Sequence, residues 1–298
     1  MATLPEVNSI QFHRPPRWRA YGTLLKSLQT GLLVLTGVAG LSSAHGLSAG
    51  PRMWSGLIVS LLLAIGGSTV LNMVYDRDID RRMQRTCSRP LPQGVVSVRE
   101  AVVLGSALTG SGVLVAFALS SLYGVLIAAG VFTDLVVYTL WLKRRSPWSI
   151  VWGGIAGAMP IVAGRALGMG VIDGPAVALG LSVLLWIPTH ILTFNLRYEE
   201  DYRRAGIPTI PQVYGQRTAR RLISVSSVLG ALAMLMAASL LGLGPGYLRL
   251  LAVLGLGLIA LAIRSALRPS ARINLVLFKS ASAFMLSGML IIGLDMLG

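Results

Sequence analysis

The sequence predicts an all-α, polytopic membrane protein with nine transmembrane helices in one bundle and a cytoplasmic N-terminus. Of its 298 residues, 54% are hydrophobic and only 12% are charged, whereas soluble proteins carry about 25% charged residues. The charges are also segregated, because long neutral runs alternate with short basic segments. This alternation is typical of helices that cross a bilayer and of the loops between them.

Nine apolar runs approach the roughly 20 residues that a helix needs to cross the hydrocarbon core. Short connections such as SSLYG and GLGPG place neighbouring helices antiparallel, and segments such as GGIAG (153–157) allow close helix contact. We expect one transmembrane domain over 28–298, preceded by a basic cytoplasmic arm over 1–27. The nine predicted spans are 28–44, 56–74, 99–119, 122–141, 149–168, 175–194, 221–241, 247–264 and 274–295.

Basic residues are distributed unevenly between the two sides of the predicted bundle. All but three of the 26 Lys and Arg residues lie in the N-terminal arm or near the connections after the second, fourth, sixth and eighth spans; the exceptions are Arg52, Arg165 and Arg249. The positive-inside rule therefore predicts a cytoplasmic N-terminus. It also accounts for the net charge of +15 without nucleic-acid binding. The single cysteine, Cys87, excludes an intramolecular disulfide and a CxxC metal site.

The first candidate site is the motif NMVYDRDIDRRMQRTCSRPLPQG, which follows the second span. Asn72, Asp76 and Asp80 recur every four residues and so lie on one face of a helix. Such a stripe of oxygen ligands favours Mg²⁺, which usually completes its coordination with phosphate oxygens. The alternative is a solvated helix end in which neighbouring arginines pair with the carboxylates. Three polar residues in register at a membrane helix end favour a functional site.

Basic residues beside these carboxylates suit a diphosphate. Arg85, Thr86 and Arg89 precede Pro90, which ends the helix and turns the chain. A guanidinium binds two phosphate oxygens at once. Lys143, at the end of the fourth span, is a further phosphate-binding candidate, although topological charge explains it equally well. These side chains predict a site for Mg²⁺ and a diphosphate at the cytoplasmic face.

A second acidic cluster, NLRYEED, follows the sixth span on the same side. Asn195 and Glu199 repeat the four-residue spacing, and Asp201 lies four residues after Arg197. Asp201 is therefore either a metal ligand or the partner of that arginine, and a solvated helix end is the alternative for the whole cluster. Acidic groups from two spans that face one cavity would hold two cations with a diphosphate between them.

Three polar residues lie deeper in the predicted spans. A carboxylate inside a membrane is costly, so Asp134 of the fourth span either pairs with Arg165 of the fifth or orients a substrate; the sequence leaves both open. His190 lies near the inner end of the sixth span. A lone buried histidine is more often hydrogen-bonded structure, with binding of an acceptor as the functional alternative.

In order along the chain, the first motif and the segments YTLWLKR, GGIAGAMPIVAG, WIPTH and EEDYRRAGIPTIPQVYG resemble the UbiA superfamily of intramembrane prenyltransferases, over about residues 20–290. They most resemble the branch that transfers a farnesyl group to protoheme IX. That branch pairs an NxxxDxxxDxxMxRTxxRPLxxG motif with a PPHFW-type and a DYxxAGIPMLP-type segment. The first motif fits, but Ile191 replaces the aromatic residue after His190, and PMLP is replaced by residues 208–211, PTIP.

The resemblance implies a bundle around a central, laterally open cavity that holds the prenyl chain. It implies Mg²⁺-dependent transfer from farnesyl diphosphate to heme B, giving heme O, by a multi-pass protein of the cell membrane, with association with heme A synthase or oxidase assembly. Motifs and resemblance together assign metal ligation to Asn72, Asp76, Asp80, Asn195, Glu199 and Asp201, substrate binding to Arg85, Thr86, Arg89, Tyr138, Lys143 and His190, and catalysis to Asn72, Asp76, Asp80, Lys143 and Asp201.

Two other functions stay open from the sequence. The acceptor could be another molecule, such as 4-hydroxybenzoate or a glycerol phosphate lipid. The non-enzymatic alternative is a transporter or channel. Transporters bind ions near the membrane midplane on broken helices, whereas the polar motifs here gather at one face, and this distribution favours the enzyme.

Overall fold

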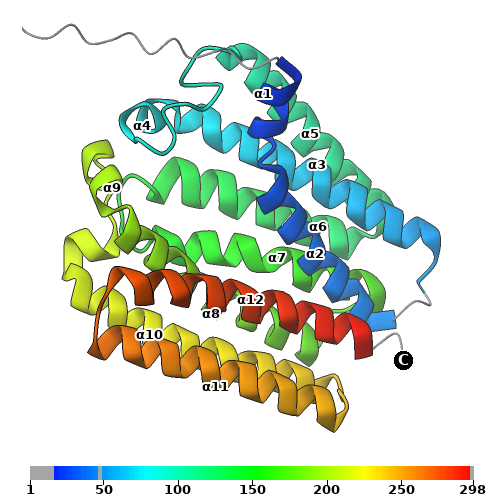
Figure 1. Cartoon of the computed structure of the whole chain (residues 1–298). Helices are drawn as coiled ribbons and strands as arrows, with labels where there is room; N and C mark the ends of the chain where they lie inside the picture. The colour runs from blue at the N-terminus through cyan, green and yellow to red at the C-terminus, as the bar shows by residue number, and fades with distance from the viewer. Residues whose placement is uncertain (1–16, 46–48, 296–298) are drawn as a thin grey trace, which may run out of the picture.

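The computed structural model describes residues 17–45 and 49–295, and within these ranges the chain is helical without a β-strand (Figure 1). Eight helices are long and apolar enough to cross a membrane, and the pair α1 and α2, bent by 45°, brings the number of spans up to nine. These helices confirm the predicted all-α, multi-pass membrane protein.

Each predicted span corresponds to a helix, although the seventh begins earlier than predicted and bends at Gly215. Residues 1–16 of the predicted arm lie outside the described residues. The elements are α1 (Arg17–Leu24), α2 (Ser27–His45), α3 (Pro51–Tyr75), α4 (Arg77–Arg82), α5 (Val98–Leu119), α6 (Ser121–Phe132), the π-helix η2 (Thr133–Leu142), α7 (Ser149–Met169), α8 (Gly174–Arg197), α9 (Glu199–Ala205), α10 (Ile210–Leu240), α11 (Pro245–Leu267) and α12 (Ala271–Asp295).

Local sequence signals set several helix ends. Pro51 occupies the first turn of α3, where its missing N–H has no intrahelical partner to lose. Ser97 and Glu100 form a capping box at the start of α5. Asp173 caps α8 by accepting the backbone N–H of Ala176 at 2.9 Å. These caps fix where the apolar spans begin.

Glycines allow the helix pairs α3–α5 and α2–α7 to pack with their backbones close together. A methyl group on Gly112 of α5 would lie 2.4 Å from the backbone nitrogen of Ala64 in α3. One on Gly164 of α7 would lie 2.1 Å from the carbonyl oxygen of Gly37 in α2. Such contacts stabilise membrane helices, which cannot gain stability by leaving water.

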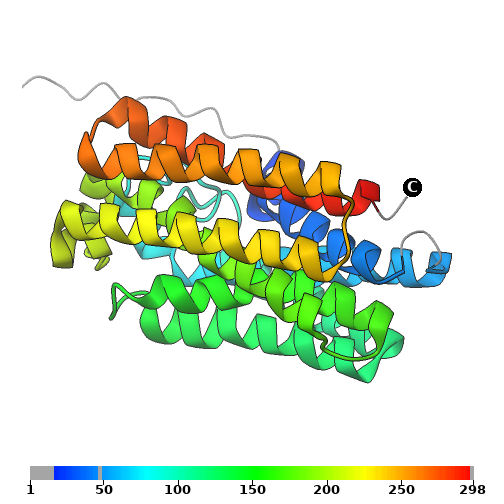
Figure 2. The same ribbon diagram turned by 90° about the horizontal axis from the view of Figure 1, so that it is seen from below.

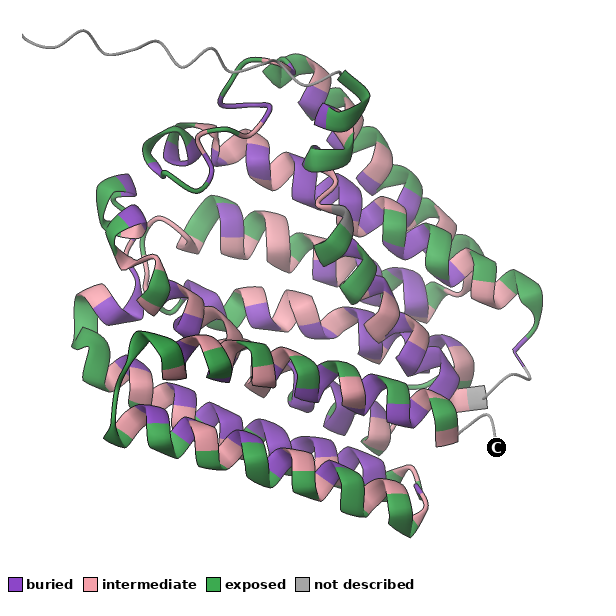
Figure 3. Cartoon of the chain, viewed as in Figure 1, coloured by how far each residue is buried: buried purple, intermediate pink, exposed green. Residues whose placement is uncertain are grey.

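Two large apolar clusters form the interior, and α7 contributes to both. One joins α7 and α8 to α10, α11 and α12, and the other joins α7 to α2, α3 and α6. Figure 2 shows α10, α11 and α12 along one side of the bundle. Large apolar side chains such as Leu114, Val253 and Leu256 are exposed, and exposed residues line the outer helix faces (Figure 3). An apolar outer surface suits contact with lipid.

The short helices α4 and α9 lie together at one end of the bundle (Figures 1 and 2). A small apolar cluster of Ile79, Met83, Ala205 and Ile207 joins them, with Tyr202 packed against it. The connection after α3 and the connection after α8 therefore contact each other, although more than 100 residues separate them in the sequence. This contact positions the candidate site.

Candidate active site

Asn72, Asp76 and Asp80 keep their helical spacing although α3 ends between them. Asn72 lies in the last turn of α3, Asp76 at the junction and Asp80 in α4. The backbone N–H of Asp76 donates to the carbonyl of Asn72 at 2.9 Å, and that of Asp80 donates to the carbonyl of Asp76 at 2.8 Å. Both carboxylate residues are buried, with 7% and 3% of their surface exposed. Burial of two acidic groups requires compensating partners.

Asp80 is compensated by Arg89. One guanidinium nitrogen, Nη1, donates to Oδ1 at 3.0 Å and to Oδ2 at 2.8 Å. The Thr86 hydroxyl donates to the backbone carbonyl of Asp80 at 3.1 Å. The neighbouring Arg77 and Arg81 instead donate to backbone carbonyls of the following loop. The loop therefore wraps around Asp80 and presents Arg89 to it.

Asp76 is compensated by Lys143, whose ammonium group bonds to Oδ2. The other carboxylate oxygen, Oδ1, is buried and has no hydrogen-bond partner. A buried, charged oxygen without a partner is costly. Coordination of a cation by this oxygen would remove that cost.

Lys143 reaches Asp76 from a span that changes from α to π geometry. In a π-helix each N–H bonds to the carbonyl five residues earlier, and the N–H of Lys143 bonds to the carbonyl of Tyr138 at 2.8 Å. The ammonium group lies 5.5 Å from the centre of the Tyr138 ring. Tyr138 and Lys143 therefore meet at the site, although they are five residues apart.

Asp134, in the same π-helix, accepts a hydrogen bond from the Asn72 side chain at 2.9 Å. The pairing with Arg165 that the sequence left open is absent. Arg165 instead bonds to Asp173, with Nε 2.8 Å from Oδ1 and Nη2 2.7 Å from Oδ2, and to the carbonyl of Ser43. Asp134 is thus part of the Asn72 site, whereas Arg165 ties α7 to the start of α8 and the end of α2.

Asp201 of α9 also reaches the first motif. It is buried, and its two oxygens accept the backbone N–H groups of Gln84 and Arg85, each at 3.2 Å. The two acidic clusters therefore meet at one end of the bundle. In this arrangement Asp201 holds the turn that carries Arg85, and neither of its oxygens is free of backbone contacts.

The rest of the second cluster points elsewhere. Glu199 accepts a hydrogen bond from the Gln216 side chain at 2.7 Å. The guanidinium of Arg197 lies over the Tyr198 ring, at 5.5 Å from its centre, rather than beside Asp201. Asn195 is buried in the last turn of α8. These contacts do not bring Glu199 to the carboxylates of the first motif.

Aromatic side chains continue the site into the bundle. The exposed Arg85 lies 4.9 Å from the centre of the Phe194 ring. His190, one turn earlier in α8, stacks on Phe278 of α12 with 4.5 Å between ring centres. Its Nδ1 lies 3.2 Å from the Ser282 hydroxyl. His190 is therefore half-buried between two helices, one turn deeper in the bundle than Phe194, over which Arg85 lies.

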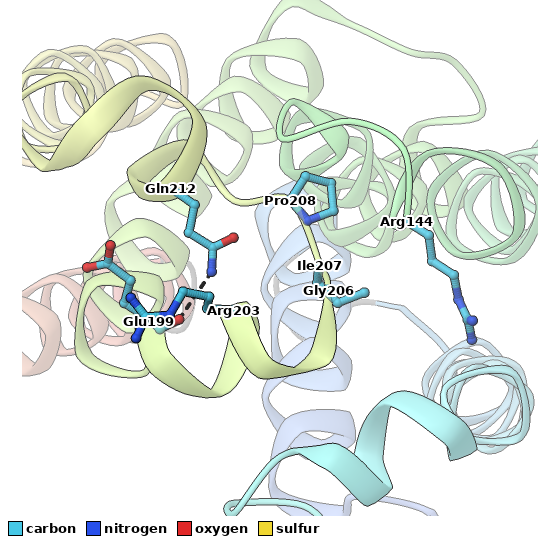
Figure 4. A pocket seen from close by; sticks show the side chains of 7 residues that line it. All are labelled: Arg144, Glu199, Arg203, Gly206, Ile207, Pro208 and Gln212. Atoms are coloured by element: carbon cyan, nitrogen blue, oxygen red, sulfur yellow. Dashed lines mark hydrogen bonds between the residues drawn. The ribbon is translucent and has the colours of Figure 1, made fainter.

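A cavity of about 530 Å³ opens at the same end (Figure 4). Arg144, on one side of it, pairs with the exposed Asp78 at 2.7 Å. These hydrogen bonds from Arg144 lower the pKa of Asp78 below its ordinary value. The cavity is lined by Arg144, Glu199, Arg203, Gly206, Ile207, Pro208 and Gln212.

Sequence reasoning missed Lys26, which it placed in the N-terminal arm. Lys26 lies between α1 and α2 in the left-handed region, with a φ of 42°, and is half-buried. It interacts electrostatically with Asp76 and Asp80, and with Arg89 and Lys143. Its position directly before the first apolar run was the only local signal, and the bend that brings it to the site is not visible in the sequence.

The residues present fit a Mg²⁺ ion that a substrate helps to hold. Within 17–45 and 49–295, no three His, Cys, Asp or Glu side chains converge as a complete metal site. The candidate oxygens belong to Asn72, Asp76 and Asp80, and among them Oδ1 of Asp76 lacks a partner. Mg²⁺ is usually bound by one or two carboxylates together with substrate phosphates, so this incomplete set matches its chemistry.

Comparison with known proteins gives consistent matches. The model of the UbiA prenyltransferase family matches residues 33–288. A protoheme IX farnesyltransferase of Pyrobaculum neutrophilum is 42% identical over 212 residues, which cover 71% of this chain and 76% of that protein. One of Korarchaeum cryptofilum is 37% identical over 247 residues, which cover 83% of each chain.

Solved structures share the fold at lower identity. A structure of digeranylgeranylglyceryl phosphate synthase superposes with a TM-score of 0.80 at 18% identity, covering 94% of this chain and 99% of that chain. A UbiA homologue from Archaeoglobus fulgidus, bound to GPP and Mg²⁺, superposes with a TM-score of 0.63 at 18% identity, covering 92% and 99%. These likenesses support the arrangement of the helices.

Proposed function

The chain belongs to the UbiA prenyltransferase family, and we propose that it transfers the farnesyl group of farnesyl diphosphate to heme B, giving heme O. Relatives about 40% identical that bear the name protoheme IX farnesyltransferase support this choice of donor and acceptor. The full set of motif residues from Asn72 to Gly94 also supports it.

The observation that carries the proposal is the buried pairing of acidic and basic groups where α3, α4 and η2 meet. Asp76 has an oxygen without a partner, and Lys143 and Arg89 bring two cations to the same place. Carboxylates suit a divalent cation, and the ammonium and guanidinium groups suit diphosphate oxygens. A prenyl diphosphate and its metal ion present this combination of charges.

In this proposal Asn72, Asp76 and Asp80 would hold Mg²⁺, which would offset negative charge on the leaving diphosphate. Asp201 holds the turn 84–85, since it accepts both backbone N–H groups there. Its assignment as a direct metal ligand is therefore less favoured than a role in placing Arg85.

The chain's own residues bind and separate the reacting groups. Arg89 and Lys143, with Arg85 from the same loop as Arg89, bind the diphosphate and stabilise the negative charge that develops when the allylic C–O bond breaks. Thr86, predicted to bind substrate, instead holds this loop to the backbone carbonyl of Asp80. The electron pair leaves with the diphosphate. The apolar bundle holds the farnesyl chain and keeps bulk water from the allylic cation.

The acceptor is proposed to enter on the His190 side. A vinyl carbon of heme B bonds to farnesyl C1, one water adds to the resulting cation, and a proton is released, which gives a hydroxyethylfarnesyl group. His190, Phe278 and Phe194 form a connected group of aromatic rings on this side, and flat aromatic ligands pack well against such groups.

Mass spectrometry of the products tests the proposal. The purified chain is incubated with farnesyl diphosphate, Mg²⁺ and either heme B, 4-hydroxybenzoate or a glycerol phosphate lipid. We expect heme O in the incubation with heme B, and no prenylated product with either of the other two acceptors. If prenylated 4-hydroxybenzoate or a prenylated lipid forms and heme O does not, heme B is not the acceptor. The family membership of the chain would be unchanged.

A further inference from the structure

We infer that Asp134 and Thr139 are positioning residues that fix the side-chain amide of Asn72, so that its oxygen is held ready as a metal ligand. This inference rests on the proposed metal–diphosphate site and adds a second layer of residues to it. The sequence left Asp134 without an assigned role and gave no role to Thr139.

Both ends of the Asn72 amide are engaged by the π-helix η2. The Thr139 hydroxyl donates to Oδ1 of Asn72 at 2.7 Å, and Nδ2 of Asn72 donates to Oδ2 of Asp134 at 2.9 Å. Thr139 is buried, with 1% of its surface exposed. These bonds join α3 to η2 at the last turn before Asp76.

The two hydrogen bonds hold the amide in one orientation. The NH₂ group of Asn72 faces Asp134, whose Oδ2 accepts its hydrogen bond. Its oxygen then faces Thr139, which occupies one of the two lone pairs. The second lone pair stays available to a cation. Without Asp134 and Thr139, the amide could turn its NH₂ group, which cannot bind a metal, toward the site.

The π geometry of η2 brings both partners to one amide. Asp134 and Thr139 are five residues apart, and five residues in an α-helix rotate a side chain by about 140° away from the starting face. In a π-helix the residue five positions on is the hydrogen-bonded neighbour instead. The same segment ends at Leu142, directly before Lys143, which pairs with Asp76. Segments of π-helix are frequent at functional sites, and here the segment orients two members of one motif.

Metal binding tests the inference without turnover. The purified full-length chain in detergent is titrated with Mn²⁺ in the presence of inorganic diphosphate, and free Mn²⁺ is measured by electron paramagnetic resonance. Supporting residues of this kind typically change metal affinity by about 10- to 100-fold. We therefore expect Thr139→Val to weaken Mn²⁺ binding about tenfold, and Thr139→Ser, which keeps the hydroxyl, to restore it.

Asp134→Asn is a second, independent test. An amide at 134 can either donate to Asn72 or accept from it, so it no longer favours one orientation of the Asn72 amide. We expect it to weaken Mn²⁺ binding as well. Thr133→Val is the matched control, since it removes a hydroxyl of the same π-helix that bonds only to the Ala129 carbonyl, at 2.8 Å. It should bind Mn²⁺ like the wild type.

Wild-type affinity in both Thr139→Val and Asp134→Asn would overturn the inference, as would failure of Thr139→Ser to restore binding. If Thr139→Val does not elute as a monodisperse protein, Asp134→Asn decides. A product other than heme O would overturn the proposed acceptor and leave this titration intact. Wild-type protein that binds no Mn²⁺ with diphosphate would overturn both.

Discussion

At the scale of single residues, Asp76 and Asp78 show how two neighbouring carboxylates acquire different roles. Asp76 is buried, bonds to Lys143 and keeps one oxygen without a partner. Asp78 is exposed and bonds to Arg144 through both oxygens. The free oxygen of Asp76 can still bind a cation. The pair of Asp78 and Arg144 is instead a surface ion pair, which contributes little to stability.

We therefore predict that Asp76→Asn lowers the rate of farnesyl transfer by at least roughly 100-fold, because losing a direct ligand should cost no less than losing a group that only supports one. Asp78→Asn, the matched control, should keep at least half of the wild-type rate. Initial rates of diphosphate release at saturating Mg²⁺ measure both. Equal losses in the two variants would contradict the difference that we draw between them.

Arg165 and Asp173 form a pair of a different kind, remote from the candidate site. The hydrogen bonds from Arg165 hold the pKa of Asp173 below its ordinary value. A carboxyl with a depressed folded-state pKa stabilises the fold above its unfolded pKa of about 3.9 and loses that contribution as the pH falls through the folded-state pKa. The pair therefore stabilises the bundle at neutral pH.

We expect Asp173→Asn to destabilise the protein by about 1.5–3 kcal/mol at pH 7, the usual cost of losing hydrogen bonds to a charged group. The difference from wild type should shrink as the pH is lowered below about 4. Thermal unfolding in detergent, followed by tryptophan fluorescence at pH 7 and at lower pH, measures it. A difference that is independent of pH would show that the charge of Asp173 is not what matters.

At the scale of helices, close backbone contact means that some glycines can be replaced by a larger residue and others cannot. Gly110 and Gly112 lie two residues apart in α5, but a methyl group on Gly110 meets nothing within 4 Å, whereas one on Gly112 lies 2.4 Å from the Ala64 backbone. Because Ala64 belongs to α3, a side chain at 112 would push apart the two helices that lead into the site.

Gly112→Ala should therefore lower the stability by about 1–3 kcal/mol, the cost of overpacking, whereas Gly110→Ala should be neutral or slightly stabilising, because alanine favours a helix. Thermal unfolding of the two variants in the same detergent compares them directly. If Gly110→Ala were the more harmful of the two, the α3–α5 contact would not control the effect.

The spans could be predicted from the sequence because the length and polarity of an apolar run are local properties. The π-helix could not, since TDLVVYTLWL has the composition of any membrane span and its register depends on contacts with Asn72 at the end of α3 and, through Lys143, with Asp76. For the same reason, helical spacing predicted that Asn72, Asp76 and Asp80 share a stripe, but it could not reveal the partners Asp134 and Thr139.

Long-range contacts limited the prediction of the site in the same way. Arg89, Thr86 and Lys143 were recognised as neighbours of the carboxylates by their chemistry and position in the chain, and their binding roles stay predictions. Lys26 was missed because it reaches the site only through the bend between α1 and α2. The backbone bonds of Asp201 depend on the contact between α4 and α9.

At the scale of the whole molecule, the charge distribution predicts that the candidate site faces the cytoplasm. The only cysteine, Cys87, lies in the connection between α4 and α5 at that end of the bundle, so the natural chain carries its own topology probe. A membrane-impermeant maleimide should label Cys87 in inside-out vesicles and not in right-side-out vesicles.

The complementary probe is Gly246→Cys in a Cys87→Ser background, at the start of α11 and at the opposite end of a span. The maleimide should label the cysteine at position 246 in right-side-out vesicles and not in inside-out vesicles. Labelling of Cys87 from outside, with Gly246→Cys labelled from inside, would invert the topology.

The ion pairs Asp76–Lys143 and Asp80–Arg89 have one more consequence. Before any ligand arrives, each anion already has a cation. A lone diphosphate would therefore have to draw Lys143 or Arg89 away from its carboxylate, and a lone metal ion at Oδ1 of Asp76 would lie beside the Lys143 ammonium group, which repels it. A complex of the two, in which the metal ion offsets much of the diphosphate charge, brings a cation for the carboxylates and an anion for Lys143 and Arg89 at the same time. We therefore expect synergy: half-saturation by each ligand should fall steeply as the other is added, and calorimetric titrations that showed independent binding would refute this exchange.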